Sequence, residues 1–194
     1  MNNQFFALIS RMRYINRWGL MRNSLPENVQ EHSHMTAVLA HALAVIRRDV
    51  CKVPCDPDRA ASVALFHDAS EIITGDLPTP IKYNNEELMS AYKNVERLAA
   101  KRLLAGLTEE LREAYAPLLT TPADDEYHIL VKAADKLSAY IKCVEERKAG
   151  NAEFLAAERQ TLMWLQDSGL REVEYFMQSF MPAFEMTLDE LETV

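Results

Sequence analysis

Two histidines and two aspartates in this sequence are of the types that bind metal ions: His32, His67, Asp68 and Asp135. They come from three separate predicted helices. Imidazole nitrogens and carboxylate oxygens form a mixed set that leaves coordination positions open and suits Mn, Co, Fe, Zn or Mg. A divalent ion in such a site can lower the pKa of a bound water toward ~7 and polarise a phosphoryl oxygen. The set therefore indicates metal-assisted hydrolysis.

His32 belongs to the apolar stripe of its predicted helix. At about 100° per residue, it aligns with residues further along one face: Met35, Leu39, Leu43, Ile46 and Val50. Because this stripe is expected to face the core, the imidazole is predicted to point inward. A core histidine with satisfied hydrogen bonds would show the same pattern, so its position alone leaves both interpretations open.

The other candidates also have structural alternatives. His67 and Asp68 end an apolar helix, and Glu71 follows one turn later. Asp68 could cap a new turn and Glu71 complete a D-x-x-E capping box, although this leaves His67 unexplained. Asp135 lies in a helix that is apolar on most sides, where an aspartate is rare unless it is paired or binds a cation. Its alternative is a salt bridge with a neighbouring lysine.

Helices must position these residues, and the sequence marks where they begin and end. A capping box at 28–31 opens a helix to about residue 50, and Asp56-Pro57 opens another toward Phe66. The run G-D-L-P-T-P (75–80) is predicted to be a loop. Further helices are predicted over 86–104, from about 108, over 125–149 to a stop at Gly150, over 151–169, onward to about 182, and after a capping box at 187–190. With no strand alternation, residues 1–194 are predicted to form a single all-α domain.

Composition narrows the function further. The net charge of −8 makes a nucleic-acid polymer an unfavourable partner. No run approaches the ~18 apolar residues of a membrane span, and the N-terminus reverses the basic-then-apolar order of a signal peptide. Cys51 and Cys55 could join a zinc site, but no second pair completes it, so ordinary reduced thiols are favoured. We therefore expect a cytoplasmic protein without membrane or nucleic-acid partners.

The sequence resembles a known family over nearly its whole length. His32 followed by the His67-Asp68 pair and a distant helical aspartate is the pattern of the HD superfamily of metal-dependent phosphohydrolases. Five runs are similar to those of the bacterial HD-domain 5′-deoxynucleotidases: I-N-R-W-G-L-M-R-N (15–23), E-N-V-Q-E-H-S (27–33), H-D-A-S-E-I-I-T-G-D-L-P-T-P-I-K-Y (67–83), K-A-A-D-K-L-S-A-Y-I-K-C (132–143) and F-M-P-A-F-E-M-T-L-D-E (180–190). The resemblance implies a single-domain HD-type helical bundle.

The resemblance also implies roles for the site residues. The four metal ligands would be His32, His67, Asp68 and Asp135, holding one divalent transition metal. Cobalt or manganese is expected, with zinc, iron, copper and magnesium as alternatives. Glu71 would orient the water or pass a proton to the leaving 5′-oxygen. Asp76 would act at the sugar or leaving-group side, although a simple turn aspartate fits its loop equally well.

Substrate contacts follow from the same resemblance. Arg17 would hold the phosphate and Trp18 would pack against the sugar, leaving no room for a 2′-hydroxyl. Without the resemblance, the pair would be interpreted as a surface arginine and a helix-packing tryptophan. His32, Asp76, Thr79 and Lys82 complete the expected substrate-binding set. A homodimer is also implied.

The expected reaction is hydrolysis of 2′-deoxyribonucleoside 5′-monophosphates to deoxynucleosides and phosphate. One alternative is another HD chemistry, such as a triphosphohydrolase or a cyclic-nucleotide or alarmone phosphodiesterase. Such substrates need more basic residues, for which Arg17, Arg22 and Lys82 are candidates. The other alternative is a catalytically silent nucleotide-binding module.

Overall fold

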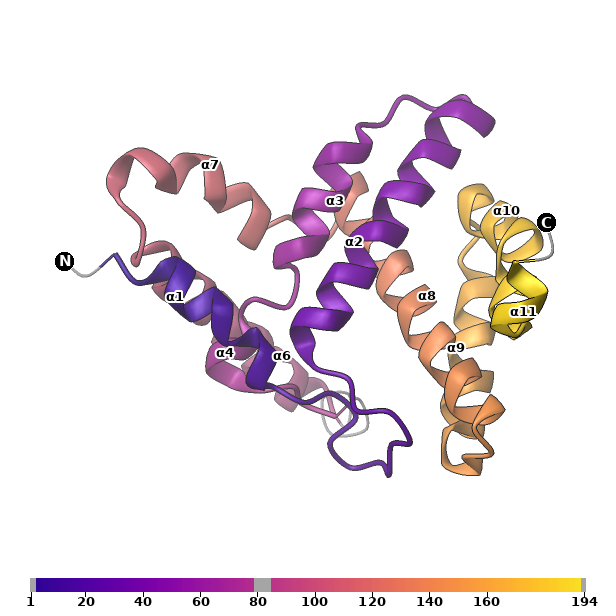
Figure 1. The fold of residues 1–194 in the computed structure, drawn as a ribbon. Helices are drawn as coiled ribbons and strands as arrows, with labels where there is room; N and C mark the ends of the chain where they lie inside the picture. Colours follow the sequence, from indigo (N-terminus) through magenta and orange to yellow (C-terminus); the bar gives the residue numbers. More distant parts are fainter. Residues whose placement is uncertain (1–2, 79–84, 193–194) are drawn as a thin grey trace.

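Three helices form the centre of the protein. The computed structural model describes residues 3–78 and 85–192. In it, α2 (Val29–Val45) packs against both α3 (Pro57–Phe66) and α8 (Glu126–Lys148) (Figure 1). Each of the three has a polar residue at its N-cap: Asn28, Asp56 and Asp125 accept hydrogen bonds from backbone amides of the first turn. Local sequence therefore fixes where the central helices begin.

Small side chains allow these helices to approach closely. Ala40 and Ala44 of α2, Ala64 of α3, and Ala133 and Ala134 of α8 are all fully buried. Larger residues fill the space around them: Leu43, Leu130, Leu137 and Val144. Each buried leucine contributes about 1.5–3 kcal/mol relative to an exposed position. The core thus holds the helices that carry the candidate ligands in a fixed arrangement.

The remaining helices flank this centre on two sides (Figure 1). One flank contains α1 (Phe5–Ile9), η1 (Ser10–Tyr14), α4 (Glu71–Thr74), α6 (Glu86–Leu104) and α7 (Glu109–Leu119). It has a smaller core formed by Phe5, Ala69, Leu103 and Leu107. The other flank contains η3 (Ala152–Phe154), α9 (Leu155–Asp167), α10 (Arg171–Ser179), η4 (Met181–Glu185) and α11 (Leu188–Leu191). Within the described ranges, no helix is both long enough and apolar enough to cross a membrane.

The predicted all-α fold is confirmed, with one local correction. The first predicted helix ends as an α-helix at Val45 and continues as a π-turn, η2 (Ile46–Val50), closed by the Cys51 amide on the Ile46 carbonyl at 2.9 Å. A π-turn shifts the phase of the helix. As a result Val50, predicted on the core stripe with His32, is 45% exposed.

Residues 15–28, here called the 15–28 segment, connect η1 to α2 and fold back on themselves. The Arg17 amide donates to the Glu27 carbonyl, and the Val29 amide donates to the Ile15 carbonyl, both at 2.9 Å. From α8, the buried Glu146 accepts from the Ser24 amide at 2.9 Å and from the Leu25 amide at 3.2 Å. The segment is therefore fastened both to itself and to the central helix.

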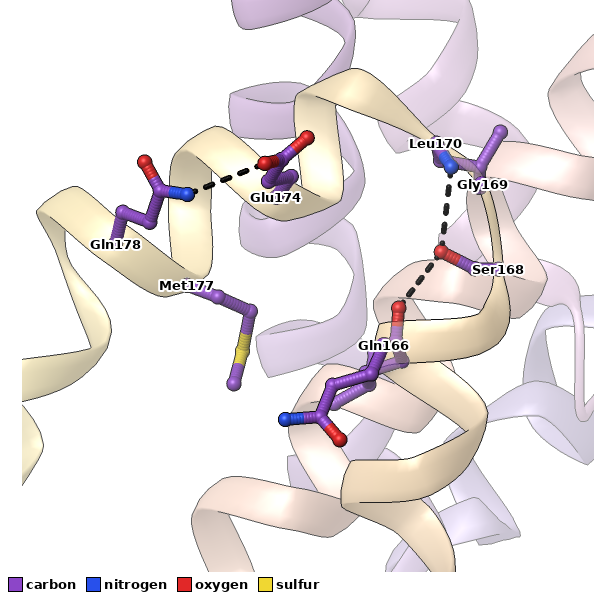
Figure 2. A pocket seen from close by; sticks show the side chains of 8 residues that line it. Gln166, Ser168, Gly169, Leu170, Glu174, Met177 and Gln178 are labelled. Carbon is purple, nitrogen blue, oxygen red and sulfur yellow. Dashed lines mark hydrogen bonds between the residues drawn. The ribbon is translucent and has the colours of Figure 1, made fainter.

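The junction of α9 and α10 encloses a small pocket away from the centre. Its volume is about 370 Å³, and Ser168 bridges the turn by donating to the Leu165 carbonyl and accepting from the Leu170 amide (Figure 2). Glu174 is the one ionisable residue among the described residues of its lining. This pocket has no set of groups for hydrolytic chemistry.

Candidate metal centre and the adjoining cavity

His32 is oriented by a hydrogen bond from the neighbouring helix. Its side chain is fully buried on α2, and its Nδ1 lies 3.2 Å from the hydroxyl of Ser138 on α8. Its Nε2 consequently faces the carboxylates, 3.1 Å from Oδ1 of Asp135 and 3.5 Å from Oδ2 of Asp68. The inward orientation predicted for His32 is confirmed, and the ring points its Nε2 at acidic oxygens.

His67 has the same arrangement at the C-terminal end of α3. Its Nδ1 pairs with the carbonyl of Ala64 at 2.7 Å, and its Nε2 lies 3.1 Å from Oδ2 of Asp68. Metal-binding histidines usually make this second bond through the ring nitrogen that does not bind the metal, which fixes the tautomer and the ring orientation. Both histidines are therefore oriented with Nε2 toward the carboxylates, as a candidate ligand atom.

The donor atoms of His32, His67 and Asp135 lie close enough to hold one metal ion. One ligand atom from each falls within 4.8 Å of the others. Asp68 lies outside this set of three, but its Oδ2 is within 3.5 Å of both imidazoles. Two imidazoles and two carboxylates suit a divalent transition metal in an open site. In the described part of the chain, the set contains no cysteine, so the alternative of a zinc site at Cys51 and Cys55 is unsupported.

The charges of the cluster support the same interpretation. Burial opposes ionisation of Asp68, but His67, His32 and Arg17 outweigh it and hold the pKa of Asp68 well below its usual range. The pKa of Asp135 is also far below its usual range, because its contacts with His32 outweigh burial. Burial and the nearby Arg17 lower the pKa of His32. Anionic aspartates and a neutral imidazole are the forms that bind metals, and His32 fits this. For His67, burial is outweighed by Asp68 and Asp135, which raise its pKa, so a metal would have to displace a proton from this ring.

The salt-bridge alternative for Asp135 is only partly supported. Lys136 is adjacent, but its Nζ lies 3.7 Å from Oδ2, whereas Nε2 of His32 lies 3.1 Å from Oδ1. The capping alternative for Asp68 and Glu71 is not supported. The N-cap of α4 is Ser70, without a side-chain capping bond, and the side chain of Asp68 points to the imidazoles.

The cluster opens into a cavity of about 780 Å³. The predicted site residues on its lining are Arg17, Trp18, Asp68, Glu71, Asp76 and Asp135. His32 and His67 contact this lining through Asp68 and Asp135. The predicted substrate residues Thr79 and Lys82 lie outside the residues that the structure describes. The structure therefore brings six predicted residues to one cavity, next to the two histidines.

Glu71 and Asp76 provide two further carboxylates at this cavity. Glu71 is 8% exposed and begins α4, with its amide 3.0 Å from the Asp68 carbonyl. Asp76 follows Gly75, whose φ of 72° requires the left-handed region and ends α4. Burial raises the pKa of Asp76, and Arg17 partly opposes this. Asp76 thus lines the cavity together with Arg17.

Arg17 and Trp18 both donate hydrogen bonds to Glu27, a residue that the sequence analysis did not single out. The side chain of Arg17 is only 12% exposed, so it is not an ordinary surface arginine. Its Nη1 lies 3.4 Å from Oδ2 of Asp68, and its Nε donates to Glu27 at 3.0 Å. Trp18 packs on Phe154 with 5.2 Å between ring centroids. Glu27 lies in one of the runs that carry the family resemblance, which was its only sequence signal.

Other residues of the site were also missed from sequence. Ser138, which bonds His32, lies three residues after Asp135, and this one-turn spacing was its only signal. Part of the cavity wall comes from η3 and α9: Glu153, Ala156, Ala157, Gln160, Thr161 and Trp164. No motif marked these, because helix packing alone brings α9 to the cavity.

Solved structures show which class this fold belongs to. An HD-domain phosphohydrolase from Listeria innocua matches with a TM-score of 0.83 and 22% identity, covering 98% of this chain and 92% of that one. The cyanophage S-2L HD phosphohydrolase, described as bound to dA and one catalytic Zn²⁺ ion, matches with a TM-score of 0.61 and 26% identity, covering 93% and 96%. With the ordered His32, His67-Asp68 and Asp135 set, this fold defines an HD-domain phosphohydrolase.

Sequence comparison resolves the family within that class. The family described as 5′-deoxynucleotidase YfbR-like matches residues 4–184. A 5′-deoxynucleotidase of Cronobacter sakazakii is 48% identical over 97% of this chain and 96% of its own length. The Escherichia coli protein named 5′-deoxynucleotidase YfbR is 47% identical over 97% and 96%. The chain belongs to the YfbR-like 5′-deoxynucleotidase family, a family of hydrolases.

Proposed function

We propose that this protein hydrolyses 2′-deoxyribonucleoside 5′-monophosphates to deoxynucleosides and phosphate. Its ligands for one divalent transition metal are His32, His67, Asp68 and Asp135. The observation that carries the proposal is a cluster of metal-ligand atoms opening into a cavity that also presents Arg17 and Trp18. The family name, shared by relatives at nearly 50% identity, and the dA in the phage enzyme support the same substrate class.

The residues around the cavity have complementary roles in this reaction. A bound divalent ion would supply Lewis-acid activation of water and of the phosphoryl group. Arg17 binds the phosphate and stabilises the charge that develops on its oxygens. Glu71 moves a proton between the attacking water and the leaving 5′-oxygen. Asp76 acts on the sugar side, and Trp18 packs where a 2′-hydroxyl would lie.

The balance of charge around the cavity favours a monophosphate. The described lining residues contain the carboxylates Asp68, Glu71, Asp76, Asp135 and Glu153, against the cations Arg17 and Lys136. Arg22, a candidate for additional phosphates, has a side chain that is 94% exposed and pairs with Glu153. Among the described lining residues, two cations and five carboxylates surround the proposed metal, a balance that suits the charge of one phosphate better than that of a triphosphate or an alarmone. A single phosphate, held by one metal and one arginine, fits this lining better.

Cobalt or manganese is the proposed metal, with zinc, iron, copper and magnesium as alternatives. A mixed imidazole and carboxylate set accepts several of these ions, and the phage enzyme is described with zinc.

Residues 1–194 are proposed to act as one domain in the cytoplasm, which suits the three free cysteines. We also propose a homodimer, which would bury exposed apolar side chains near the C-terminus, such as Phe180, Leu188 and Leu191.

Phosphate release tests the proposal directly. Metal-stripped protein is assayed with dAMP, AMP and 3′-dAMP, without metal and with cobalt, manganese or zinc. We expect metal-dependent release from dAMP and little from AMP or 3′-dAMP. Equal release from dAMP and AMP would contradict the sugar preference while keeping the metal-dependent reaction. Release from triphosphates or cyclic nucleotides alone, or nucleotide binding without turnover, would replace the proposed function with one of its alternatives.

A further inference from the structure

Glu27 contacts both residues that are proposed to recognise the substrate. Its Oε2 accepts a hydrogen bond from Nε of Arg17 at 3.0 Å and another from the indole Nε1 of Trp18 at 2.9 Å. The Glu27 side chain is 16% exposed. One carboxylate oxygen therefore fixes the guanidinium and the indole relative to each other.

The backbone brings Glu27 to this position. The Arg17 amide donates to the Glu27 carbonyl at 2.9 Å, and Asn16 and Asn28 form an isolated antiparallel bridge beside it. Glu27 thus faces Arg17 across the fold of the 15–28 segment. Residue 28 is also the N-cap of α2, the helix that carries His32. The carboxylate is built into the start of a central helix, not onto a free loop.

Trp18 needs such a contact because its backbone is strained. Its φ of 59° lies in the left-handed region, which costs a bulky residue about 1–3 kcal/mol unless its surroundings hold it there. The hydrogen bond to Glu27 and the packing of the ring on Phe154 hold its side chain, and its carbonyl accepts from the Met21 amide at 2.8 Å. Without the carboxylate, the indole loses its polar partner, and a more ordinary backbone becomes accessible.

Arg17 is oriented by the same contact. Glu27 accepts a hydrogen bond from Nε of the guanidinium, while Nη1 is directed toward Asp68. A guanidinium fork binds a phosphate best when its plane is fixed. The carboxylate of Glu27 also adds to those of Asp135 and Asp68, which together outweigh burial and raise the pKa of Arg17.

We propose that Glu27 is a positioning residue that couples phosphate binding to sugar selection by holding Arg17 and Trp18 through one oxygen. This inference rests on the proposed function and adds a determinant of selectivity beyond the cavity surface. The size of Trp18 excludes the 2′-hydroxyl only while Glu27 holds the indole in place. A change at Glu27 therefore alters both KM and the preference for deoxyribose.

Two substitutions separate the hydrogen bonds from the charge. Glu27→Ala removes the acceptor, and we expect KM for dAMP to rise about 10-fold and the preference for dAMP over AMP, in kcat/KM, to fall about 10-fold. Glu27→Gln keeps a carbonyl oxygen that can accept from both donors, and its preference should stay close to that of the wild type. Equal losses for dAMP and AMP in Glu27→Ala, or an equal loss of preference in Glu27→Gln, would contradict the coupling.

A spectroscopic measurement tests the contact without using activity. The chain has two tryptophans, so the indole N–H resonance of Trp18 in a ¹⁵N spectrum is assigned with Trp164→Phe. In Glu27→Ala this resonance should move upfield, toward that of an indole in water, and in Glu27→Gln it should move little. If wild-type protein fails to hydrolyse dAMP, the proposed function is wrong, and the resonance still decides whether Glu27 holds Trp18. An unshifted resonance in Glu27→Ala would overturn the inference.

Glu31→Ala provides a matched control for loss of stability. Glu31 is exposed, lies four residues after Glu27, and closes the capping box of α2 by accepting from the Asn28 amide at 3.2 Å. Its loss should lower Tm without changing the dAMP preference or the Trp18 resonance. A fall in preference as large as that of Glu27→Ala would show a general effect of destabilising the start of α2, and would contradict a specific role for Glu27.

Discussion

The Nδ1 atom of His32 lies 3.2 Å from the hydroxyl of Ser138, which stands three residues after Asp135 on α8. The helix that supplies one proposed metal ligand therefore also orients another. The hydrogen bond directs Nε2 of His32 to Asp135 at 3.1 Å. Ser138 thus hydrogen-bonds the proposed ligand His32 from outside the cluster, and such partners usually contribute to metal affinity.

Ser138→Ala should weaken metal binding by roughly 10–100-fold while the protein stays folded. The ring of His32 loses the partner that fixes its orientation, whereas only one hydroxyl leaves the core. Metal affinity is measured by competition with a chelator. Ser33→Ala is the control, because Ser33 is buried beside His32 and its Oγ makes no hydrogen bond within the described residues. Equal affinities of Ser138→Ala and wild type would contradict the role.

His67→Ala should remove most of the bound metal and lower phosphate release by at least about 10³-fold, since a proposed ligand is lost. Metal content and dAMP hydrolysis are measured on the same preparations. His34→Ala is the control: His34 is exposed on α2, two residues from His32, and should keep both properties. Full activity of His67→Ala in metal-replete buffer would show that the proposed mechanism is wrong.

Glu71→Gln should lower kcat by roughly 10²–10⁴-fold with the metal content unchanged. The amide has nearly the same shape as the carboxylate but cannot take up the proton. Glu71 lines the cavity beside Asp68, so its effect should be on turnover rather than on binding. Rate measurements at saturating dAMP, together with metal analysis, separate these outcomes. If Glu71→Gln loses its metal ion, Glu71 acts as a metal ligand instead.

Trp18→Ala should lower the preference for dAMP over AMP, by about 10-fold or more, because the space for a 2′-hydroxyl opens. The ratio of kcat/KM for the two nucleotides measures this effect. Hydrolysis of 3′-dAMP serves as a reference, since enlarging the sugar space should not create activity at the 3′-position. A preference that survives the substitution would place sugar selection elsewhere on the cavity wall.

Glu146→Gln should destabilise the protein by roughly 3 kcal/mol, because it leaves the buried Lys142 without a carboxylate. The effect depends on pH. Burial opposes ionisation of Glu146, but hydrogen bonds from Lys142, Asn151 and the amides of Ser24 and Leu25 lower its pKa from 4.5 to about 2. The contribution of ionised Glu146 to the free energy of unfolding is therefore fully present above about pH 4.5 and is lost as the pH falls toward 2.

Denaturant unfolding of the wild type and of Glu146→Gln across this pH range checks the prediction. The difference in the free energy of unfolding between the two should be constant near neutral pH and should shrink below about pH 4.5. Glu145→Gln is the comparison, since Glu145 is the exposed neighbour on the same helix and burial raises its pKa, so its difference should change with pH in the opposite sense. A difference that does not change with pH would mean that Glu146 is not ionised in the folded protein.

Local signals in the sequence predicted much of this fold. Asn28 with Glu31 marks the start of α2, and Gly150 and Gly169 mark stops where the backbone adopts positive φ. The π-turn after Val45 could not be predicted, because its residues continue the same apolar spacing. The cost of a phase shift there depends on tertiary packing.

The site was predictable to the extent that its residues form motifs. His67 and Asp68 are adjacent in sequence, whereas the bond between His32 and Ser138 spans 106 residues and the bond between Ser24 and Glu146 spans 122. Such contacts depend on the crossing of α2 and the 15–28 segment with α8. Glu27 shows the same limit at a shorter range, since only the folded segment brings it to Trp18.

The helix α8 carries Asp135 at the metal cluster and Glu146, eleven residues later, at the 15–28 segment. This separation is about 16 Å along a straight helix, so the length of α8 sets the distance between the proposed metal cluster and the 15–28 segment. Inserting one residue between them would rotate Glu146 by about 100° away from Ser24 and Leu25. Side chains along this stretch can therefore vary, whereas a change in its length would break the contacts that join α8 to the 15–28 segment.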